Sequence, residues 1–131
     1  MKNTLTVAAA LIVKGDKFFV CRRPENKDRA LLWEFVGGKA EQGETLRETL
    51  RRECREELGA EIAVGGEFCT VNYEYEDVFV KITVFLADVV AGKIQLLEHS
   101  DGRWVTAQQA EELPFCPADK EILKRIKRFV H

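Results

Sequence analysis

The sequence lacks three features that mark other classes of protein. It has no apolar stretch approaching the roughly 20 residues that a membrane-spanning helix requires. It has no excess of positive charge, since 20 basic and 22 acidic side chains give a formal net charge of −2. It also has no internal repeat, low-complexity run or linker. We therefore expect no membrane and no nucleic-acid polymer as a partner, whereas a small polyanion can be held by a few arginines and a divalent cation.

Cysteine chemistry is also sparse. The four cysteines form no Cys-x-x-Cys pair and no dense disulfide pattern; they are Cys21, Cys54, Cys69 and Cys116. We expect reduced, mostly buried thiols. The apolar run near the N-terminus is followed by Lys14-Gly15-Asp16-Lys17, where a signal peptide would need a small-residue cleavage site. The sequence therefore predicts a cytoplasmic protein, and it makes no prediction of oligomeric state.

Apolar periodicity predicts strands and helices that follow one another along the chain. Strand-like runs lie at 5–13, 18–23, 33–36, 61–75, 78–90 and 102–105, and helical signals lie at 46–58, 107–113 and 117–130. The run at 33–36 is expected to stop at Gly37-Gly38. With 131 residues and 46% hydrophobic side chains, the chain fits one domain spanning 1–131. The order of elements predicts an α+β fold, an α/β/α sandwich with a mixed β-sheet between helices.

The helix predicted at 46–58 has the clearest boundaries. Thr45 and Glu48 have the spacing of a capping box, and Gly59 stands where a left-handed C-terminal cap is expected. One apolar stripe runs along the helix, formed by Leu46, Leu50, Cys54 and Leu58. These features indicate where the helix begins and ends and which face it buries.

Three acids share one arc of this helix. Glu53, Glu56 and Glu57 are spaced i, i+3 and i+4, and like charges at that spacing repel each other by roughly 0.2–0.5 kcal/mol per pair. One explanation is a solvated surface, balanced by the arginines of the same helix. The other is a metal site, because Mg²⁺ takes oxygen ligands and is held by carboxylates together with substrate phosphates. The helix alone favours the first explanation, whereas its sequence context favours the second.

That context is a spaced pattern. From Gly38 the sequence runs through five residues to Glu44 and seven more to Arg52-Glu53-Cys54-Arg55-Glu56-Glu57-Leu58-Gly59-Ala60. It resembles the Nudix box of the Nudix hydrolases, G-x5-E-x7-R-E-U-x-E-E-x-G-U, in which U is a bulky aliphatic residue. All seven fixed residues are present, a match that arises by chance on the order of once in a million chains of this length. Cys54 and Ala60 occupy positions where the pattern has a bulky aliphatic residue. Because both are small and apolar, this departure affects how the core is packed rather than the chemistry of the motif.

The resemblance implies a metal centre that binds Mg²⁺, with Mn²⁺ as an alternative. In Nudix hydrolases the metal is bound by one carbonyl and three carboxylates, whose counterparts here are Gly37, Glu53, Glu56 and Glu57. The acid matching Glu44 pairs with the arginine matching Arg52, and this pair holds the Glu53 carboxylate in place. Glu98 matches an acid that serves in the family as a further metal ligand or as the general base. Glu53 is the rival for the general base, and the sequence does not choose between them.

Outside the box the chain resembles the MutT-type branch, small nucleoside triphosphate pyrophosphohydrolases that include enzymes cleansing oxidised nucleotides and CTP-preferring ones. The matching segments are Trp33-Glu34-Phe35 before Gly37-Gly38-Lys39, Glu98 before Trp104, and Pro117-Ala118-Asp119. The resemblance implies that water attacks the β-phosphorus of a nucleoside triphosphate and releases the monophosphate and pyrophosphate. The alternatives are another nucleoside diphosphate-X substrate, such as ADP-ribose or a dinucleoside polyphosphate, and a non-catalytic nucleotide-binding module.

The same resemblance indicates residues that bind the nucleotide. Arg23 and Lys39 match positions that reach the phosphates, a task that suits multi-donor cations. The candidates for contact with the base are aromatic, namely Phe35, Tyr73, Tyr75 and Phe79, although aromatic residues at strand spacing are more often part of the core. Asp119 matches a residue that hydrogen-bonds the edge of the base. It also suits the first turn of the last helix, where an acid favours the helix dipole.

Overall fold

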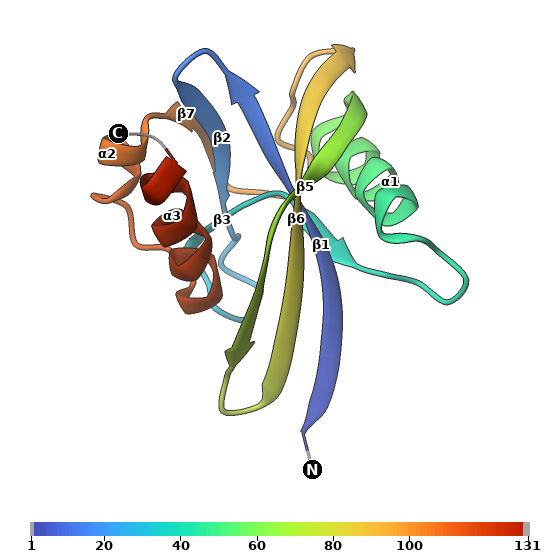
Figure 1. The fold of residues 1–131 in the computed structure, drawn as a ribbon, viewed down its shortest axis with the longest axis vertical. Coiled ribbons are helices and arrows are strands. Elements are labelled where there is room, and N and C mark those ends of the chain that lie inside the picture. The colour runs from blue at the N-terminus through green and yellow to red at the C-terminus, as the bar shows by residue number, and fades with distance from the viewer. Residues whose placement is uncertain (1, 130–131) are drawn as a thin grey trace.

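Strands and helices follow the predicted order in the computed structural model, which describes residues 2–129 (Figure 1). The strands are β1 (Asn3–Lys14), β2 (Lys17–Arg22), β3 (Trp33–Glu34), β4 (Gly37–Lys39), β5 (Glu61–Glu74), β6 (Val78–Ala91) and β7 (Asp101–Val105). The helices are α1 (Leu46–Leu58), α2 (Ala107–Ala110) and α3 (Pro117–Phe129).

The sheet is organised around β1. Residues 3–12 of this strand pair in parallel with β6, and its last residues pair in antiparallel fashion with β2. Antiparallel pairing also adds β5 to β6, and β3 and β7 to β2. The main path through the sheet is β3-β2-β1-β6-β5. Because it contains both kinds of pairing, the sheet is mixed, as the sequence predicts.

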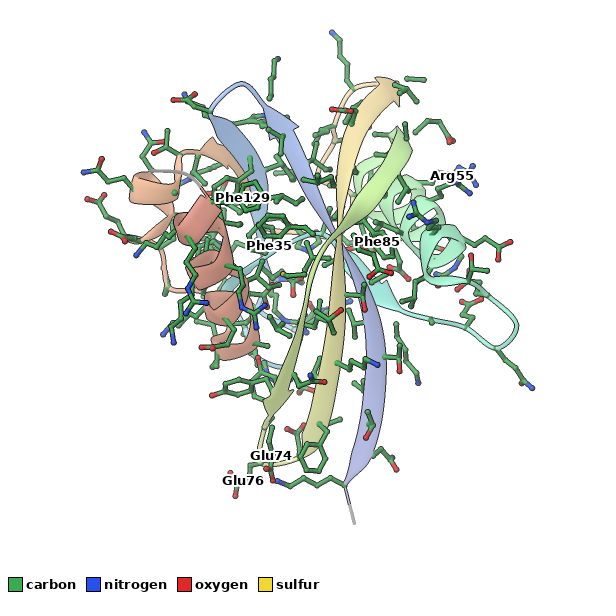
Figure 2. The ribbon with its side chains drawn as sticks, viewed as in Figure 1. Phe35, Arg55, Glu74, Glu76, Phe85 and Phe129 are labelled. Carbon is green, nitrogen blue, oxygen red and sulfur yellow. The ribbon has the colours of Figure 1, made fainter. Side chains whose placement is uncertain are left out.

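Two cores form on opposite faces of the sheet, because successive side chains of a strand point to opposite sides. Ala9 and Leu11 of β1 belong to the core that includes α3, whereas Ala8 and Ala10 belong to the core that includes α1. Figure 2 shows the same division, with one labelled ring, Phe35, on the α3 side and another, Phe85, on the α1 side. The predicted α/β/α sandwich is confirmed.

Helix α1 has the predicted ends. The Thr45 hydroxyl accepts a hydrogen bond from the Glu48 amide, and the Glu48 carboxylate accepts one from the Thr45 amide at 2.9 Å. Gly59 ends the helix with φ of 65°, the left-handed conformation that glycine adopts without strain. Cys54 and Ala60, which are smaller than the Nudix pattern expects, are both buried. The core therefore accepts the smaller volume at these positions.

Two boundaries differ from the sequence prediction. Gly37–Lys39 do not merely interrupt a strand but form β4, which pairs with Ala9, Ala8 and Val7 of β1. A side chain at Gly37 would collide with the carbonyl oxygen of Ala8, so the close approach requires glycine. Helix α2 ends at Ala110, and the chain continues to Pro114 in turns. The last predicted helical residue, Val130, lies outside the described residues.

The cysteines are free thiols, as expected, and three of the four are buried. Burial raises the pKa of Cys54 and Cys116 to about 12, which makes both thiols protonated packing groups at neutral pH. Within residues 2–129, no helix has both the length and the apolar character needed to span a bilayer.

Candidate active site

A pocket of about 450 Å³ lies against β1 and β6. Its apolar wall consists of alternate residues of these strands, namely Leu5, Val7, Ala9, Val80 and Ile82. The acidic side of the pocket is formed by Gly37 and Gly38 of β4, Glu53 and Glu57 of α1, and Glu98. The apolar side comprises the strand wall, Phe35, Tyr75 and the start of α3, including Asp119. The volume and mixed lining suit a small, partly polar ligand.

Arg52 organises the acidic side. Its Nε and Nη2 donate to the two oxygens of Glu44 at 2.7 and 3.0 Å, a bidentate ion pair, and its Nη1 donates to Glu53 Oε1 at 2.6 Å. The hydrogen bond from Arg52 and another from the Glu41 amide lower the pKa of Glu44 to about 2. The ion pair of Glu44 with Arg52 that the Nudix resemblance implies is therefore present, and Arg52 contacts the Glu53 carboxylate as that resemblance implies.

The glycines of β4 let the Glu53 carboxylate approach the backbone. A Cβ added at Gly38 would lie 2.5 Å from the carboxylate carbon of Glu53 and 2.6 Å from its Oε2. Any side chain at Gly38 would therefore displace this carboxylate. The requirement for glycine comes from the site itself rather than from a turn.

Glu57 is buried among other acids. Burial, followed by the nearby carboxylates of Glu53, Glu34 and Glu98, raises the pKa of Glu57 to about 10. Among residues 2–129, its Oε2 has no hydrogen-bond partner. A buried, unpaired carboxylate oxygen among other acids is costly unless a cation approaches it. The donor set fits a hard divalent cation, which takes carboxylate and carbonyl oxygens.

The other two acidic candidates are less enclosed. Glu56 has a side chain that is 53% exposed and contacts Arg52 at 3.4 Å, and it does not line the pocket. Glu98 is exposed but lines the pocket from the loop before β7. Within residues 2–129, no three acidic, histidine or cysteine side chains already surround a common metal position. The structure thus brings Gly37, Glu53, Glu57 and Glu98 to one pocket and leaves Glu56 at its margin.

Sequence reasoning missed two residues at the centre of the pocket. Glu34 accepts from Arg23 Nη1 at 2.9 Å through Oε1, and its Oε2 lies 2.9 Å from Nε2 of His99. His99 also lies 3.6 Å from Glu57 Oε1. Glu34 belongs to Trp33-Glu34-Phe35, a segment that resembles the MutT-type branch, and this resemblance could have indicated Glu34 as a site residue. His99 had only its place beside Glu98, because the hydrogen bond that reveals it joins residues 65 positions apart.

Asp119 lies in the pocket and in the first turn of α3 at once. Its Oδ1 accepts a hydrogen bond from the Phe35 amide at 3.0 Å. Burial, followed by the charge of Glu34, raises the pKa of Asp119 to about 8. The raised pKa favours the neutral carboxyl, which carries an O–H donor in addition to its acceptors.

The remaining candidates divide between the pocket and the opposite face. Arg23, Lys39, Phe35 and Tyr75 line the pocket. Phe79 does not line it, and its side chain is 41% exposed. It precedes Val80, which lines the pocket, and neighbouring residues of a strand point to opposite faces. The structure therefore places Phe79, a predicted contact of the base, outside this pocket.

The mouth of the pocket carries a further basic residue. The Arg29 guanidinium lies 3.7 Å from the centre of the Tyr75 ring and donates to Asp77 at 3.0 Å. The Tyr75 hydroxyl in turn accepts from the Ala118 amide at 3.0 Å. These contacts join the loop after β2, the turn between β5 and β6, and α3 around one rim.

Comparison with known proteins agrees with the architecture. The family model described as "NUDIX domain" matches residues 2–126. The CTP pyrophosphohydrolase of Escherichia coli (strain K12) is 35% identical over 120 residues, which cover 92% of this chain and 89% of that protein. The 8-oxo-dGTP diphosphatase of the same strain is 28% identical over 128 residues, covering 98% and 99% of the two chains. A crystal structure of a MutT protein from Methanosarcina mazei Go1 matches with a TM-score of 0.87 at 28% identity, covering 98% of this chain and 96% of that one.

Proposed function

Because the chain belongs to the NUDIX family, we propose that it hydrolyses a nucleoside triphosphate, ordinary or oxidised, to the monophosphate and pyrophosphate with Mg²⁺ or Mn²⁺. The observation that carries the proposal is the composition of one pocket, which adjoins a buried unpaired carboxylate, Glu57, on one side and an apolar wall with Asp119 on the other. A nucleotide has the same division between charged phosphates and a flat base. The names of the two Escherichia coli relatives support this substrate class and a role in cleansing nucleotide pools.

The proposed metal ligands are the Gly37 carbonyl, Glu53, Glu57, Glu98 and, from the margin, Glu56. When bound, the divalent cation neutralises phosphate charge and makes the phosphorus a better electrophile. The protein's own contribution is to hold the ligands in place. Arg52 fixes Glu53 from one side, and Glu44 fixes Arg52 through its bidentate ion pair.

The phosphates are assigned to Arg23 and Lys39. Arg23 is anchored by Nε to the Asp28 carbonyl at 2.6 Å and by Nη1 to Glu34 at 2.9 Å. A guanidinium has five N–H groups, so an anchored Arg23 retains donors for a phosphate oxygen. Lys39 lines the same pocket as an exposed cation beside the acidic side. These two side chains offset the negative charge that the substrate brings.

The base is assigned to the apolar side, where Asp119 meets its edge. One oxygen of Asp119 is held by the Phe35 amide, which leaves the other for the ligand. A protonated carboxyl donates to a carbonyl or ring nitrogen and also accepts from an amino group. Cytosine, guanine and 8-oxoguanine all present such mixed edges. Phe35 and Tyr75 supply aromatic surface on the same side of the pocket.

A panel of nucleotides tests the proposal. CTP, dGTP, 8-oxo-dGTP, TTP and ADP-ribose are incubated with Mg²⁺, and pyrophosphate, orthophosphate and the nucleoside monophosphate are measured separately. We expect pyrophosphate from at least one triphosphate and a loss of turnover when Mg²⁺ is chelated. Turnover of ADP-ribose alone would favour the alternative diphosphate substrate, and binding without turnover of any compound would favour a non-catalytic module.

Labelled water tests the bond that breaks. Attack on the β-phosphorus places the oxygen from water in pyrophosphate, whereas attack on the α-phosphorus places it in the monophosphate. We expect the label in pyrophosphate. The pH–rate profiles of Glu53→Gln and Glu98→Gln then identify the general base, because the variant that lacks it loses the acidic limb of the profile.

A further inference from the structure

The side chain of His99 joins the two functional regions of the pocket. Its ring is 4% exposed and lies between two carboxylates, with Nε2 2.9 Å from Glu34 Oε2 and 3.6 Å from Glu57 Oε1. Glu34 also binds Arg23, the proposed phosphate ligand. One buried ring therefore connects the phosphate side to a proposed metal ligand.

Backbone contacts fix the position of His99 relative to the same elements. Two residues before it, the Leu97 amide donates to the Glu57 carbonyl at 3.1 Å. Directly after it, the Ser100 amide donates to the Arg22 carbonyl at 3.0 Å. The loop that carries His99 is thus tied to the end of α1 and to the end of β2. An imidazole held in this way adds an orienting contact at little further cost in conformational entropy.

The hydrogen-bond partner of Nε2 is Glu34, and Glu57 Oε1 lies beside the same ring nitrogen at 3.6 Å, a contact rather than a hydrogen bond. A carboxylate oxygen accepts, so Nε2 is the donor, which assigns a ring proton to Nε2. In the part of the chain that the structure describes, neither Nδ1 of His99 nor Glu57 Oε2 has a hydrogen-bond partner. The imidazole therefore contacts the Oε1 edge of Glu57 and leaves the other oxygen free.

We propose that His99 is a positioning residue, which orients the Glu57 carboxylate so that Oε2 faces a bound divalent cation and couples this carboxylate to Glu34 and Arg23. The inference rests on the proposed metal site. Residues that orient metal ligands typically contribute about 10–100-fold to metal affinity or activity. A histidine that merely fills space would be replaceable by a side chain of similar volume without that loss.

Two amide variants separate the roles. In His99→Gln the amide nitrogen reaches about as far as Nε2 and can donate to Glu34 and Glu57. In His99→Asn the amide nitrogen stops near the position of Nδ1, which has no partner. Ser100→Ala serves as a control for disturbance of the loop, since the Ser100 hydroxyl contacts the Arg22 side chain and the backbone carbonyls of Arg22 and Arg23 and does not line the pocket.

Mn²⁺ binding to the substrate-free protein, measured by electron paramagnetic resonance, is the readout, with melting temperature measured in parallel. We expect His99→Asn to weaken Mn²⁺ binding at least about tenfold, and His99→Gln and Ser100→Ala to remain within about threefold of the parent. Equal Mn²⁺ affinity for His99→Asn and the parent would overturn the inference, as would an equal loss in His99→Asn and His99→Gln. If His99→Asn fails to fold, His99→Gln decides alone, because a tenfold loss in a folded Gln variant contradicts the donor role and retention supports it.

Glu57→Gln separates failure of this inference from failure of the proposed metal site. If Glu57→Gln loses Mn²⁺ affinity while His99→Asn does not, only the role of His99 is wrong. If Glu57→Gln binds Mn²⁺ as tightly as the parent, the assignment of the metal site itself is wrong.

Discussion

The acidic and apolar sides of the pocket are built in different ways. Most of the acidic side comes from one stretch of chain, since Gly37, Gly38, Glu53 and Glu57 lie within 21 consecutive positions. The apolar side is assembled from β1, β6, the segment around Phe35 and the start of α3. A local arrangement of charges leaves a strong sequence pattern, whereas a wall gathered from distant elements does not. A sequence pattern can therefore identify the acidic side, which is proposed to carry the chemistry. It cannot identify the apolar side, which is proposed to select the base.

The largest expected effect is on the acidic side. Glu57→Gln preserves shape but cannot supply a negative charge to a bound cation, so turnover should fall by at least about a hundredfold, the scale of losing a key electrostatic group. Steady-state kinetics at saturating Mg²⁺ measures the effect. Glu61→Gln is a suitable control, because that glutamate is exposed and, among the described residues 2–129, forms an ion pair only with Arg55. Near-normal turnover in Glu57→Gln would remove this residue from the metal site.

The next effect distinguishes two arginines of the same helix. Arg52 is 22% exposed and binds Glu44 and Glu53, so Arg52→Ala leaves partly buried carboxylates unpaired. We expect a fall of about 5 °C in melting temperature and about tenfold or more in kcat. Arg55, which is 57% exposed and pairs with Glu61, provides the comparison. Arg55→Ala should change melting temperature by less than about 2 °C, because exposed ion pairs contribute little. Equal effects of the two substitutions would contradict the proposed role of Arg52.

A third prediction concerns the pH dependence of stability on the apolar side. The pKa of Asp119 rises from its ordinary value of 3.8 to about 8 on folding. Between these values the folded state holds a proton that the unfolded state has lost, so the contribution to stability is complete below about pH 4 and disappears as the pH rises through 8. Asp119→Asn keeps the size and the acceptor for the Phe35 amide but cannot ionise. Relative to the parent, the variant should therefore gain stability as pH rises, by at most about 1.4 kcal/mol per pH unit for one proton.

Chemical denaturation of both proteins between pH 5 and pH 8 measures this difference. A difference in unfolding free energy that stays constant with pH would show that Asp119 is ionised in the folded protein. The base-edge proposal would then revert to an acceptor-only carboxylate.

The smallest effect is expected at Phe79, which lies on the far face of its strand from the pocket. Phe79→Ala should change kcat/KM by less than about twofold. Tyr75→Ala should raise KM by about fivefold or more, since contact between a base and an aromatic ring contributes roughly 1–3 kcal/mol. Melting temperatures of both variants control for loss of packing. A larger kinetic effect at Phe79 than at Tyr75 would reverse the assignment of the strand face.

The sequence predicted the parts of the molecule that depend on local spacing. The capping box at Thr45 and Glu48, the left-handed Gly59 and the ion pair of Glu44 with Arg52 are all present. These features depend on residues a few positions apart, whose geometry a helix or turn defines. The aromatic residues that line the pocket were harder to predict. Tyr75 and Phe79 are both aromatic residues near strand ends, and only the three-dimensional structure shows which of them faces the pocket.

Long-range contacts explain the remaining omissions. The role of Glu34 depends on Arg23 and His99, and the protonation of Asp119 depends on burial against Phe35 and Glu34. Neither follows from periodicity, since each requires knowledge of which distant side chains share a low-dielectric pocket. The motif includes Gly38 as its first fixed residue. The reason that glycine is needed there, the close approach of the Glu53 carboxylate, is visible only in three dimensions.

The most direct test of the different roles proposed for the acidic and apolar sides of the pocket is a set of kcat/KM measurements. It covers dGTP, 8-oxo-dGTP, CTP and TTP for the parent, Glu57→Gln and Asp119→Asn. If the acidic side carries the chemistry and the apolar side selects the base, Glu57→Gln lowers every value by a similar factor and keeps the parent's ranking. Asp119→Asn changes the ranking, because the carboxyl oxygen left for the base can both donate and accept, whereas the amide nitrogen that replaces it only donates. A common shift of all four substrates in Asp119→Asn, or a changed ranking in Glu57→Gln, would contradict the account.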